Sequence, residues 1–212
     1  MKRLIALEGC DRTGKSTFIS KLQNEIKRLG YIPFVFHLMG PTKFNNLKFD
    51  NDDKSLIQLS KFNDELDLFR EMLNSNEKVV IILDRSHFGE YVWTKYWNRV
   101  GKYTDYLFTQ EFFERHNDLF QNMLYINFYV SNVDILVNRI ASFEEDTKIF
   151  TDNGKTIKEN VFYVYQLFSE LLDIVKRNNI LNMEIDNSGT IIDLDKKIWN
   201  VISNCELKIT YS

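Results

Sequence analysis

The segment Gly9–Ser16 constrains the fold more than any other part of this sequence. It reads GCDRTGKS and fits the pattern G-x-x-x-x-G-K-[ST]. An apolar run, LIAL, precedes it, and an amphipathic stretch follows from Lys15 onward. In that context the pattern indicates a buried strand, a tight loop and then a helix. Glycine is scarce, with eight in 212 residues, so the occurrence of Gly9 and Gly14 within six residues is informative.

A loop of this kind is suited to binding a polyphosphate. Glycines let successive backbone N–H groups approach phosphate oxygens, and the N-terminus of the following helix adds partial positive charge. Lys15 offers a mobile positive charge, and Ser16 offers an oxygen ligand for Mg²⁺. A glycine-rich turn without function is the alternative, and the strand–loop–helix context argues against it. The sequence therefore predicts a site for ATP or GTP with Mg²⁺, formed by Gly9, Thr13, Gly14, Lys15, Ser16 and Thr17.

Short apolar runs alternate with amphipathic stretches along the rest of the chain. Runs such as VVIILD and LYINFYV lack polar alternation, as expected for central strands buried on both faces. This order predicts one α/β domain over residues 1–212, with a parallel sheet of about five strands and helices on both faces. The expected strands are Arg3–Glu8, Ile32–Leu38, Val79–Asp84, Met123–Val130 and Leu181–Asp186. The expected helices are Lys15–Leu29, Lys54–Leu73, Gly89–Asn98, Gln110–Leu119, Val133–Ser142, Lys158–Asn178 and Ile191–Ser203.

Two polar segments have no clear periodicity. Gly40–Asp53 follows the second expected strand and is predicted to be a surface loop. Ser142–Lys155 lies between two expected helices and is predicted to be a mobile flap, or lid. A simple connector is an equally good interpretation of loops of this length.

Charge and composition exclude several classes of protein. With 27 Lys and Arg against 30 Asp and Glu, the formal net charge is −3, so the chain lacks the basic field that attracts nucleic-acid polymers. A hydrophobic content of 44% provides a core and excludes global disorder. Cys10 and Cys205 lie too far apart in the sequence for a disulfide framework or metal cluster. The apolar runs are too short for a signal peptide or membrane span, so a cytoplasmic protein without a membrane partner is expected.

Several motifs resemble thymidylate kinases and their deoxynucleoside-kinase relatives. LEGCDRTGKST resembles the family's P-loop, and Asp84-Arg85-Ser86 resembles its Asp-Arg-aromatic or acid-Arg-Ser motif. LYINFYVSNVDILVNRI and FYVYQLFSELL…MEIDNSGTIIDL extend the likeness over most of the chain, and DRSHFGEYVW is similar to a branch encoded by bacteriophages. The resemblance implies a P-loop NTPase fold, ATP-dependent phosphorylation of a nucleotide, and a homodimer. It also implies a cytoplasmic location, in the host cytoplasm for a phage protein.

The resemblance also assigns roles to charged residues. Arg12 corresponds to the arginine that stabilises the transferred phosphate, and together with Lys15 it is expected to be catalytic, because the predicted lid contains no arginine. Asp84 ends a buried strand, where it either holds Mg²⁺ or is a structural capping residue. In the family, the residue matching Arg85 contacts the acceptor's phosphate or 5′ oxygen, and the one matching Asp11 binds the 3′-hydroxyl of its sugar.

Arg139 and four further residues are weaker candidates for the nucleotide sites. Arg139 precedes the lid and either contacts ATP or interacts with a helix C-terminus. Lys43 is the cation closest to the place of a family arginine, and Phe62 is a candidate for stacking on the acceptor base. Trp93, nine residues after Asp84, matches an aromatic residue that favours deoxyribose, and Tyr165 matches a tyrosine of the C-terminal helix. Core packing is an equally good expectation for each aromatic residue.

The second expected strand bears on the acceptor. Its continuation, FVFHLMGPTKF, contains no acid before Asp50. A nucleoside acceptor needs a base for its 5′-hydroxyl, whereas a monophosphate is already anionic and needs only cations around it. The sequence therefore favours a thymidylate-like deoxynucleoside monophosphate as acceptor, and the missing family arginine leaves the base open. A deoxynucleoside kinase and a nucleotide-binding switch without transfer are the alternatives. The three histidines, His37 among them, have no metal-ligand spacing and are expected to be structural or solvated.

Overall fold

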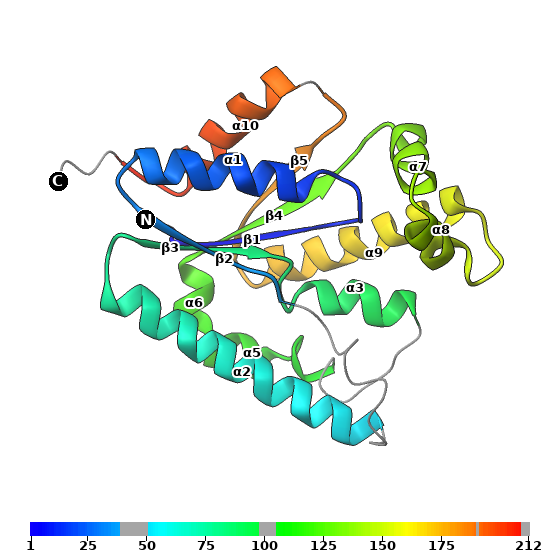
Figure 1. Cartoon of the computed structure of the whole chain (residues 1–212). Coiled ribbons are helices and arrows are strands. Elements are labelled where there is room, and N and C mark those ends of the chain that lie inside the picture. The colour runs from blue at the N-terminus through cyan, green and yellow to red at the C-terminus, as the bar shows by residue number, and fades with distance from the viewer. Residues whose placement is uncertain (39–50, 98–104, 190, 209–212) are drawn as a thin grey trace.

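A parallel five-stranded sheet forms the centre of the protein (Figure 1). The computed structural model describes residues 1–38, 51–97, 105–189 and 191–208. The strands are β1 (Leu4–Gly9), β2 (Ile32–Phe36), β3 (Val79–Asp84), β4 (Met123–Tyr129) and β5 (Leu181–Asp186), in the order β2-β3-β1-β4-β5. Leu7 of β1 pairs with Asp84 of β3 on one side and Ile126 of β4 on the other. All neighbouring strands are parallel, so their carboxyl ends meet at one edge.

Helices cover both faces of this sheet, as Figure 1 shows. In the described part of the chain they are α1 (Lys15–Arg28), α2 (Asn51–Ser75), α3 (Gly89–Tyr96), α5 (Gln110–Arg115), α6 (Asn117–Gln121), α7 (Val133–Ala141), α8 (Glu144–Thr151), α9 (Ile157–Arg177) and α10 (Ile191–Asn204). Helices α1 and α10 lie on one face, and α2, α3, α5, α6 and α9 lie on the other. This arrangement confirms the predicted fold class.

The central strands β1, β3 and β4 bury side chains on both faces, which explains their apolar pattern, whereas the edge strands β2 and β5 are partly exposed. Ile5 and Leu7 of β1 pack with Phe18 and Leu22 of α1 and Ile198 of α10 in one hydrophobic cluster. Each of these side chains is almost completely buried, and burial of a side chain of this size contributes about 1.5–3 kcal/mol. Packing on the face of the sheet that α1 and α10 cover therefore fixes the position of α1, and with it the phosphate loop that precedes α1.

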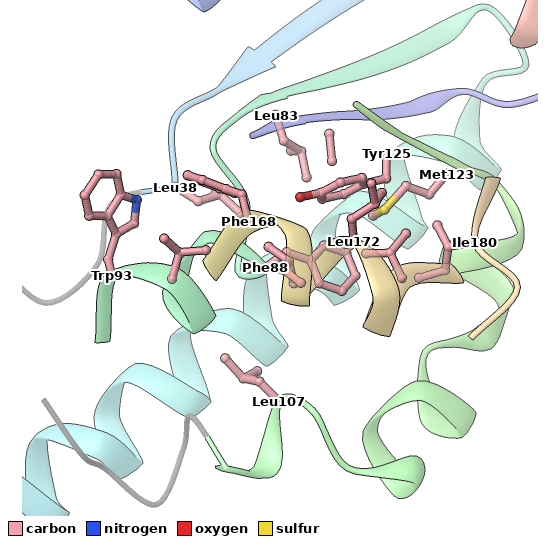
Figure 2. Close-up of a cluster of buried hydrophobic side chains, with 14 of the residues drawn as sticks. Leu38, Leu83, Phe88, Trp93, Leu107, Met123, Tyr125, Phe168, Leu172 and Ile180 are labelled. Atoms are coloured by element: carbon pink, nitrogen blue, oxygen red, sulfur yellow. The ribbon is translucent and has the colours of Figure 1, made fainter. Parts of the chain in front are cut away.

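The second face carries the larger hydrophobic cluster. Figure 2 shows Leu83 of β3 and Tyr125 of β4 beside Phe168 and Leu172 of α9. Phe88, just before α3, packs against Tyr125 with ring centroids 5.8 Å apart. Helix α9 begins with a capping box, in which Thr156 and Glu159 satisfy each other's backbone N–H groups. This core positions α3 and α9 beneath the sheet.

Two helical predictions need correction. The single helix expected over Gln110–Leu119 is two helices, α5 and α6, because the backbone at His116 leaves helical geometry (φ −109°, ψ 19°). The bend allows Phe112 of α5 and Phe120 of α6 to be buried together, with ring centroids 5.9 Å apart. The segment Ser142–Lys155, expected to be irregular, contains α8. Its first turn is acidic, which suits a helix N-terminus, and Phe150 is fully buried.

The remaining expectations concern the termini of elements and the surface. Most of Gly40–Asp53 lies outside the described residues, but α2 begins at Asn51, earlier than predicted. Cys10 and Cys205 are both buried free thiols. Within the described ranges, none of the helices has the length and apolar character needed to cross a membrane.

Candidate active site

The loop between β1 and α1 has two glycines whose conformation other residues rarely adopt. Gly9 has φ 143° and Gly14 has φ 93°. A Cβ atom at Gly9 would collide with the carbonyl oxygen of Phe128, and one at Gly14 would collide with the side-chain amide of Asn187. Both glycines of the sequence motif are therefore required by the backbone and by its close neighbours.

Lys15 lies inside the curve of this loop. Its side chain is buried, and Nζ donates hydrogen bonds to the carbonyl oxygens of Gly9 and Cys10, each at 2.9 Å. Burial lowers the pKa of Lys15, while the nearby carboxylate of Asp11 acts in the opposite direction. Thr13 closes the loop by donating from Oγ1 to Cys10 O at 2.8 Å. The ammonium group is thus held at the centre of the loop by neutral carbonyl groups.

A cavity of about 600 Å³ opens beside the loop, at the carboxyl edge of the sheet. This edge is where open α/β sheets bind their ligands. Its walls bring together residues from the loop, from the ends of β2 and β3, and from the α7–α8 region. The lining residues are Asp11, Arg12, Gly14, Lys15, Ser16, Thr17, His37, Asp84, Arg85, Arg139, Ser142, Phe143 and Asp146. Most of the charged residues singled out in the sequence therefore face one space.

Arg85 stands at the turn that follows β3. Its backbone has φ 69°, and its N–H donates to Leu7 O at 3.1 Å. Its Nη2 forms an ion pair with Oδ1 of Asp11, and its Cζ lies 5.4 Å from the ring of Trp93. Trp93 is only 5% exposed and lies behind the arginine without lining the cavity. The two residues expected to bind the acceptor, Asp11 and Arg85, therefore contact each other.

Glu8, which was not among the predicted site residues, holds the turn after β3 through hydrogen bonds. It is completely buried, and its Oε1 accepts hydrogen bonds from Ser86 Oγ at 2.7 Å, from Ser86 N and from Gly89 N at 3.2 Å. Burial raises the pKa of Glu8 to about 7, although the Ser86 hydrogen bonds oppose the shift. The feature of the sequence that could have identified Glu8 is an acidic residue at the penultimate position of an otherwise apolar strand.

Asp84 and His37 both line the cavity and contact each other. His37 Nδ1 lies 3.3 Å from Asp84 Oδ2, and the His37 side chain is 43% exposed. His37 was expected to be structural or solvated, and the structure adds that it lines the cavity. Among the described residues, no group of three or more His, Cys, Asp or Glu side chains is arranged to hold a metal by itself. Asp84 and Ser16 nevertheless suit Mg²⁺, which uses one or two protein oxygens and takes its other ligands from phosphates and water.

Arg12 contacts the segment that follows α7. Its Nε forms an ion pair with Asp146 of α8, and its Cζ lies 3.6 Å from the centroid of the Phe143 ring. Arg139 Nη1 donates to the carbonyl oxygen of Arg12 at 3.4 Å. Part of the predicted lid segment therefore packs directly on the phosphate loop.

Besides Trp93, three more predicted acceptor-binding residues do not line the cavity or lie outside the described residues. Phe62 is 1% exposed, because α2 turns this face toward the core and packs it near His87. The Tyr165 hydroxyl donates to Val130 O at 3.0 Å and accepts from Val130 N at 2.9 Å, and burial raises its pKa. Lys43 lies outside the described residues.

Asn187 is a further residue that the sequence analysis missed. It follows β5, and its Nδ2 donates to Thr13 O at 2.8 Å. The β5–α10 connection thus supports the phosphate loop at Thr13. An asparagine after a strand has no distinctive sequence signal, because the contact joins positions 174 residues apart.

Comparison with known proteins bears on the fold. No protein-family model matches the chain, and no curated protein matches it in sequence. YorR from Bacillus subtilis, in complex with phosphorylated GDP, has a similar structure, with a TM-score of 0.59, 18% identity and 96% of each chain covered. Deoxyadenosine kinase from M. mycoides, with bound dATP, superposes with a TM-score of 0.56, 18% identity and coverage of 95% of this chain and 99% of the other. The chain adopts the P-loop NTPase fold. At this level of identity the likeness concerns the fold alone.

Proposed function

We propose that this protein is a kinase that transfers the γ-phosphate of ATP to a thymidylate-like deoxynucleoside monophosphate. One observation carries the proposal: a single cavity is lined by the phosphate loop with Lys15 and also by Arg85, at the edge of the sheet where a second nucleotide would lie. The same fold in YorR, with phosphorylated GDP, and in a deoxyadenosine kinase, with dATP, supports a nucleotide as the ligand.

In the proposed reaction the loop amides and Lys15 bind the β- and γ-phosphates of ATP. Ser16 and Asp84 would hold Mg²⁺, which when bound neutralises charge on those phosphates. Arg12 stabilises the equatorial oxygens of the transferred group. An oxygen of the acceptor phosphate forms the new bond to the γ-phosphorus as the bond to the bridging oxygen of ADP breaks. Catalysis is electrostatic, without a covalent intermediate.

Charge in the cavity supports a monophosphate acceptor. Four cationic side chains, those of Arg12, Lys15, Arg85 and Arg139, line the walls. Two phosphorylated substrates side by side repel each other, so cations around both are what such a transfer needs. Arg85 would exchange its contact with Asp11 for the acceptor phosphate, because a guanidinium fork matches a phosphate well.

A deoxynucleoside kinase is the second candidate. The observation that favours it is the His37–Asp84 pair at 3.3 Å, which places a carboxylate in the cavity where it could take a proton from a 5′-hydroxyl. The deoxyadenosine kinase with the same fold points the same way.

An acceptor panel tests both candidates. ADP formation would be measured by a coupled assay with each common deoxynucleoside monophosphate, with modified pyrimidine monophosphates and with the corresponding nucleosides. The proposal predicts turnover with at least one monophosphate, loss of turnover in Lys15→Ala, and no loss in Lys27→Ala, which removes an exposed lysine of the same helix. Turnover with nucleosides alone would select the second candidate. Tight ATP binding without turnover would contradict both and favour a nucleotide-binding switch.

A further inference from the structure

We infer that Asp146 and Phe143 are positioning residues for Arg12. They hold its guanidinium by one edge and one face, so that its two terminal nitrogens are directed at the transferred phosphate. The inference rests on the proposed function, because it adds residues of the α8 segment to the phosphate-transfer site. Neither residue was identified in the sequence.

The contacts of Arg12 divide its guanidinium into a held part and an available part. Nε forms the ion pair with Asp146 Oδ2, and Cζ lies 3.6 Å over the Phe143 ring. Nη1 and Nη2 make no hydrogen bond to any described residue, while the side chain lines the cavity. A guanidinium has five N–H donors, so four of them remain for phosphate oxygens.

The arrangement fixes orientation in two ways. The carboxylate sets the direction of the Nε edge through a charge-assisted hydrogen bond. The aromatic ring fixes the plane of the guanidinium through a cation–π contact. The backbone of Arg12 is also constrained, since it has φ 61° and its carbonyl oxygen accepts from Arg139. A donor that is oriented before the substrate arrives needs no reorganisation during the reaction, which is the main source of electrostatic catalysis.

Helix α8 is itself attached to the core, so it is able to serve as a support. Phe150 near its end is fully buried, and the Phe150 carbonyl oxygen accepts from Asn160 Nδ2 of α9 at 2.7 Å. Within the acidic first turn, only Asp146 contacts Arg12. Glu144 instead pairs with Lys148 at 2.7 Å in an exposed position. The two residues that contact Arg12 therefore belong to a segment fixed to the core: Asp146 lies in α8, and Phe143 immediately precedes it.

The first test is a double-mutant cycle between Arg12 and Asp146. Arg12→Ala is expected to lower kcat by about a hundredfold or more. Asp146→Asn, which keeps the size of the side chain, is expected to lower kcat by about tenfold and to raise the KM for ATP by no more than several-fold. Because Asp146 acts through Arg12, the same change is expected to have no effect in the Arg12→Ala background. Glu145→Gln, which removes a neighbouring exposed charge from the same helix, is the matched control and should leave kcat unchanged.

The aromatic face has its own variants. Phe143→Leu should lower kcat several-fold while leaving thermal stability close to that of the parent, because Phe143 is exposed to solvent. Phe143→Tyr, which keeps the aromatic ring, should recover most of the kcat that Phe143→Leu loses. An increase of kcat in Asp146→Asn would overturn the inference, since it would mean that the pair restrains Arg12. Equal effects of Asp146→Asn with and without Arg12 would overturn it as well.

A binding measurement separates this inference from the proposed function. The ratio of the dissociation constants of ADP and ATP, each with Mg²⁺, reports contacts to the γ-phosphate without any acceptor. Asp146→Asn is expected to reduce this ratio several-fold in the parent protein and to leave it unchanged in Arg12→Ala. If no acceptor is phosphorylated but the ratio behaves as expected, the proposed function fails and the positioning role stands. If transfer occurs but the ratio and the cycle show no coupling, the positioning role fails alone.

Discussion

The cations of the cavity differ in what a bound phosphate would have to replace. Lys15 donates to two carbonyl oxygens of its own loop, and Arg85 is paired with Asp11. Both would exchange an internal partner for a phosphate oxygen on binding. Arg12 differs, because Asp146 binds its Nε while Nη1 and Nη2 have no hydrogen-bond partner among the described residues and remain available to a phosphate. The cationic side chains are therefore preorganised to different degrees. The most preorganised is Arg12, which we assign to the transferred phosphate.

The contact of Asn187 with the phosphate loop gives a prediction at the scale of one hydrogen bond. Asn187→Ala removes the 2.8 Å bond to Thr13 O, so we expect a loss of about 1 kcal/mol in the free energy of unfolding. We also expect a several-fold weaker affinity for ATP, because the loop loses a lateral support. Urea unfolding and calorimetric titration measure the two effects.

Asn182→Ala is the control for this prediction. It removes a comparable bond, from Asn182 Nδ2 to Ile180 O at 2.9 Å, at the start of β5 and away from the cavity. A similar loss of stability without a change in ATP affinity is expected there. Equal effects of the two variants on ATP affinity would contradict a supporting role for Asn187.

At the scale of elements, Glu8 joins the end of β1 to the turn before α3. Its pKa is raised to about 7, so between pH 4.5 and pH 7 the unfolded chain releases a proton that the folded protein retains. The contribution of Glu8 to stability therefore falls as pH rises through this window. Because Gln keeps the oxygen that accepts from Ser86 and Gly89, Glu8→Gln should remove this dependence.

The measurement is the free energy of unfolding of both proteins at pH 5 and pH 8. Relative to the parent, Glu8→Gln should be more stable at pH 8 than at pH 5, by roughly 3 kcal/mol at most. Titration of the other groups cancels in this comparison. Parallel pH profiles for the two proteins would show that Glu8 is not buried in an ionisable state as described.

The elements also show where sequence reasoning succeeds. The predicted bounds of β3 and β5 are correct: β3 is an apolar run that ends at Asp84, and β5 alternates apolar and polar residues and ends at Asp186. Helix α8 was missed because Phe150 is its only buried residue, so its sequence has no apolar periodicity. The break at His116 was missed because a histidine that packs against aromatic residues fits the sequence pattern of one continuous helix.

At the scale of the whole molecule, His87 makes the fold sensitive to acid. It is fully buried, and neither ring nitrogen has a hydrogen-bond partner among the described residues. Burial, together with the charge of His116, lowers the pKa of His87 to about 3. An unfolded chain would protonate this side chain near pH 6.5, so its contribution to stability is lost as pH falls from there toward pH 3.

His87→Phe should remove part of this sensitivity. The ring already lies 4.2 Å from Phe88 and 5.4 Å from Phe112, so an aromatic replacement suits the site. We expect the stability difference between pH 7 and pH 4.5 to shrink by roughly 2 kcal/mol, as measured by urea unfolding at both values. An unchanged difference would place the acid sensitivity elsewhere.

The whole site was only partly predictable. The Gly9–Ser16 motif fixes a loop by its chemistry, so Gly14, Lys15 and Ser16 were found from the sequence alone. Phe62 was predicted to stack on the acceptor base but is buried in the core, because a helical face has the same sequence pattern whether it meets a base or the core. Asp146 was missed for another reason: its contact with Arg12 exists only after 134 residues of chain have folded.

The central claim is that a phosphate passes directly from ATP to a second nucleotide in this cavity. Phosphorus NMR of the protein with ATP, Mg²⁺ and deoxynucleoside monophosphates tests it most directly. The account predicts the resonances of ADP and of a deoxynucleoside diphosphate, appearing together and only when both substrates are present. Formation of inorganic phosphate at the same rate with and without acceptor, or no reaction while ATP is bound, would contradict it.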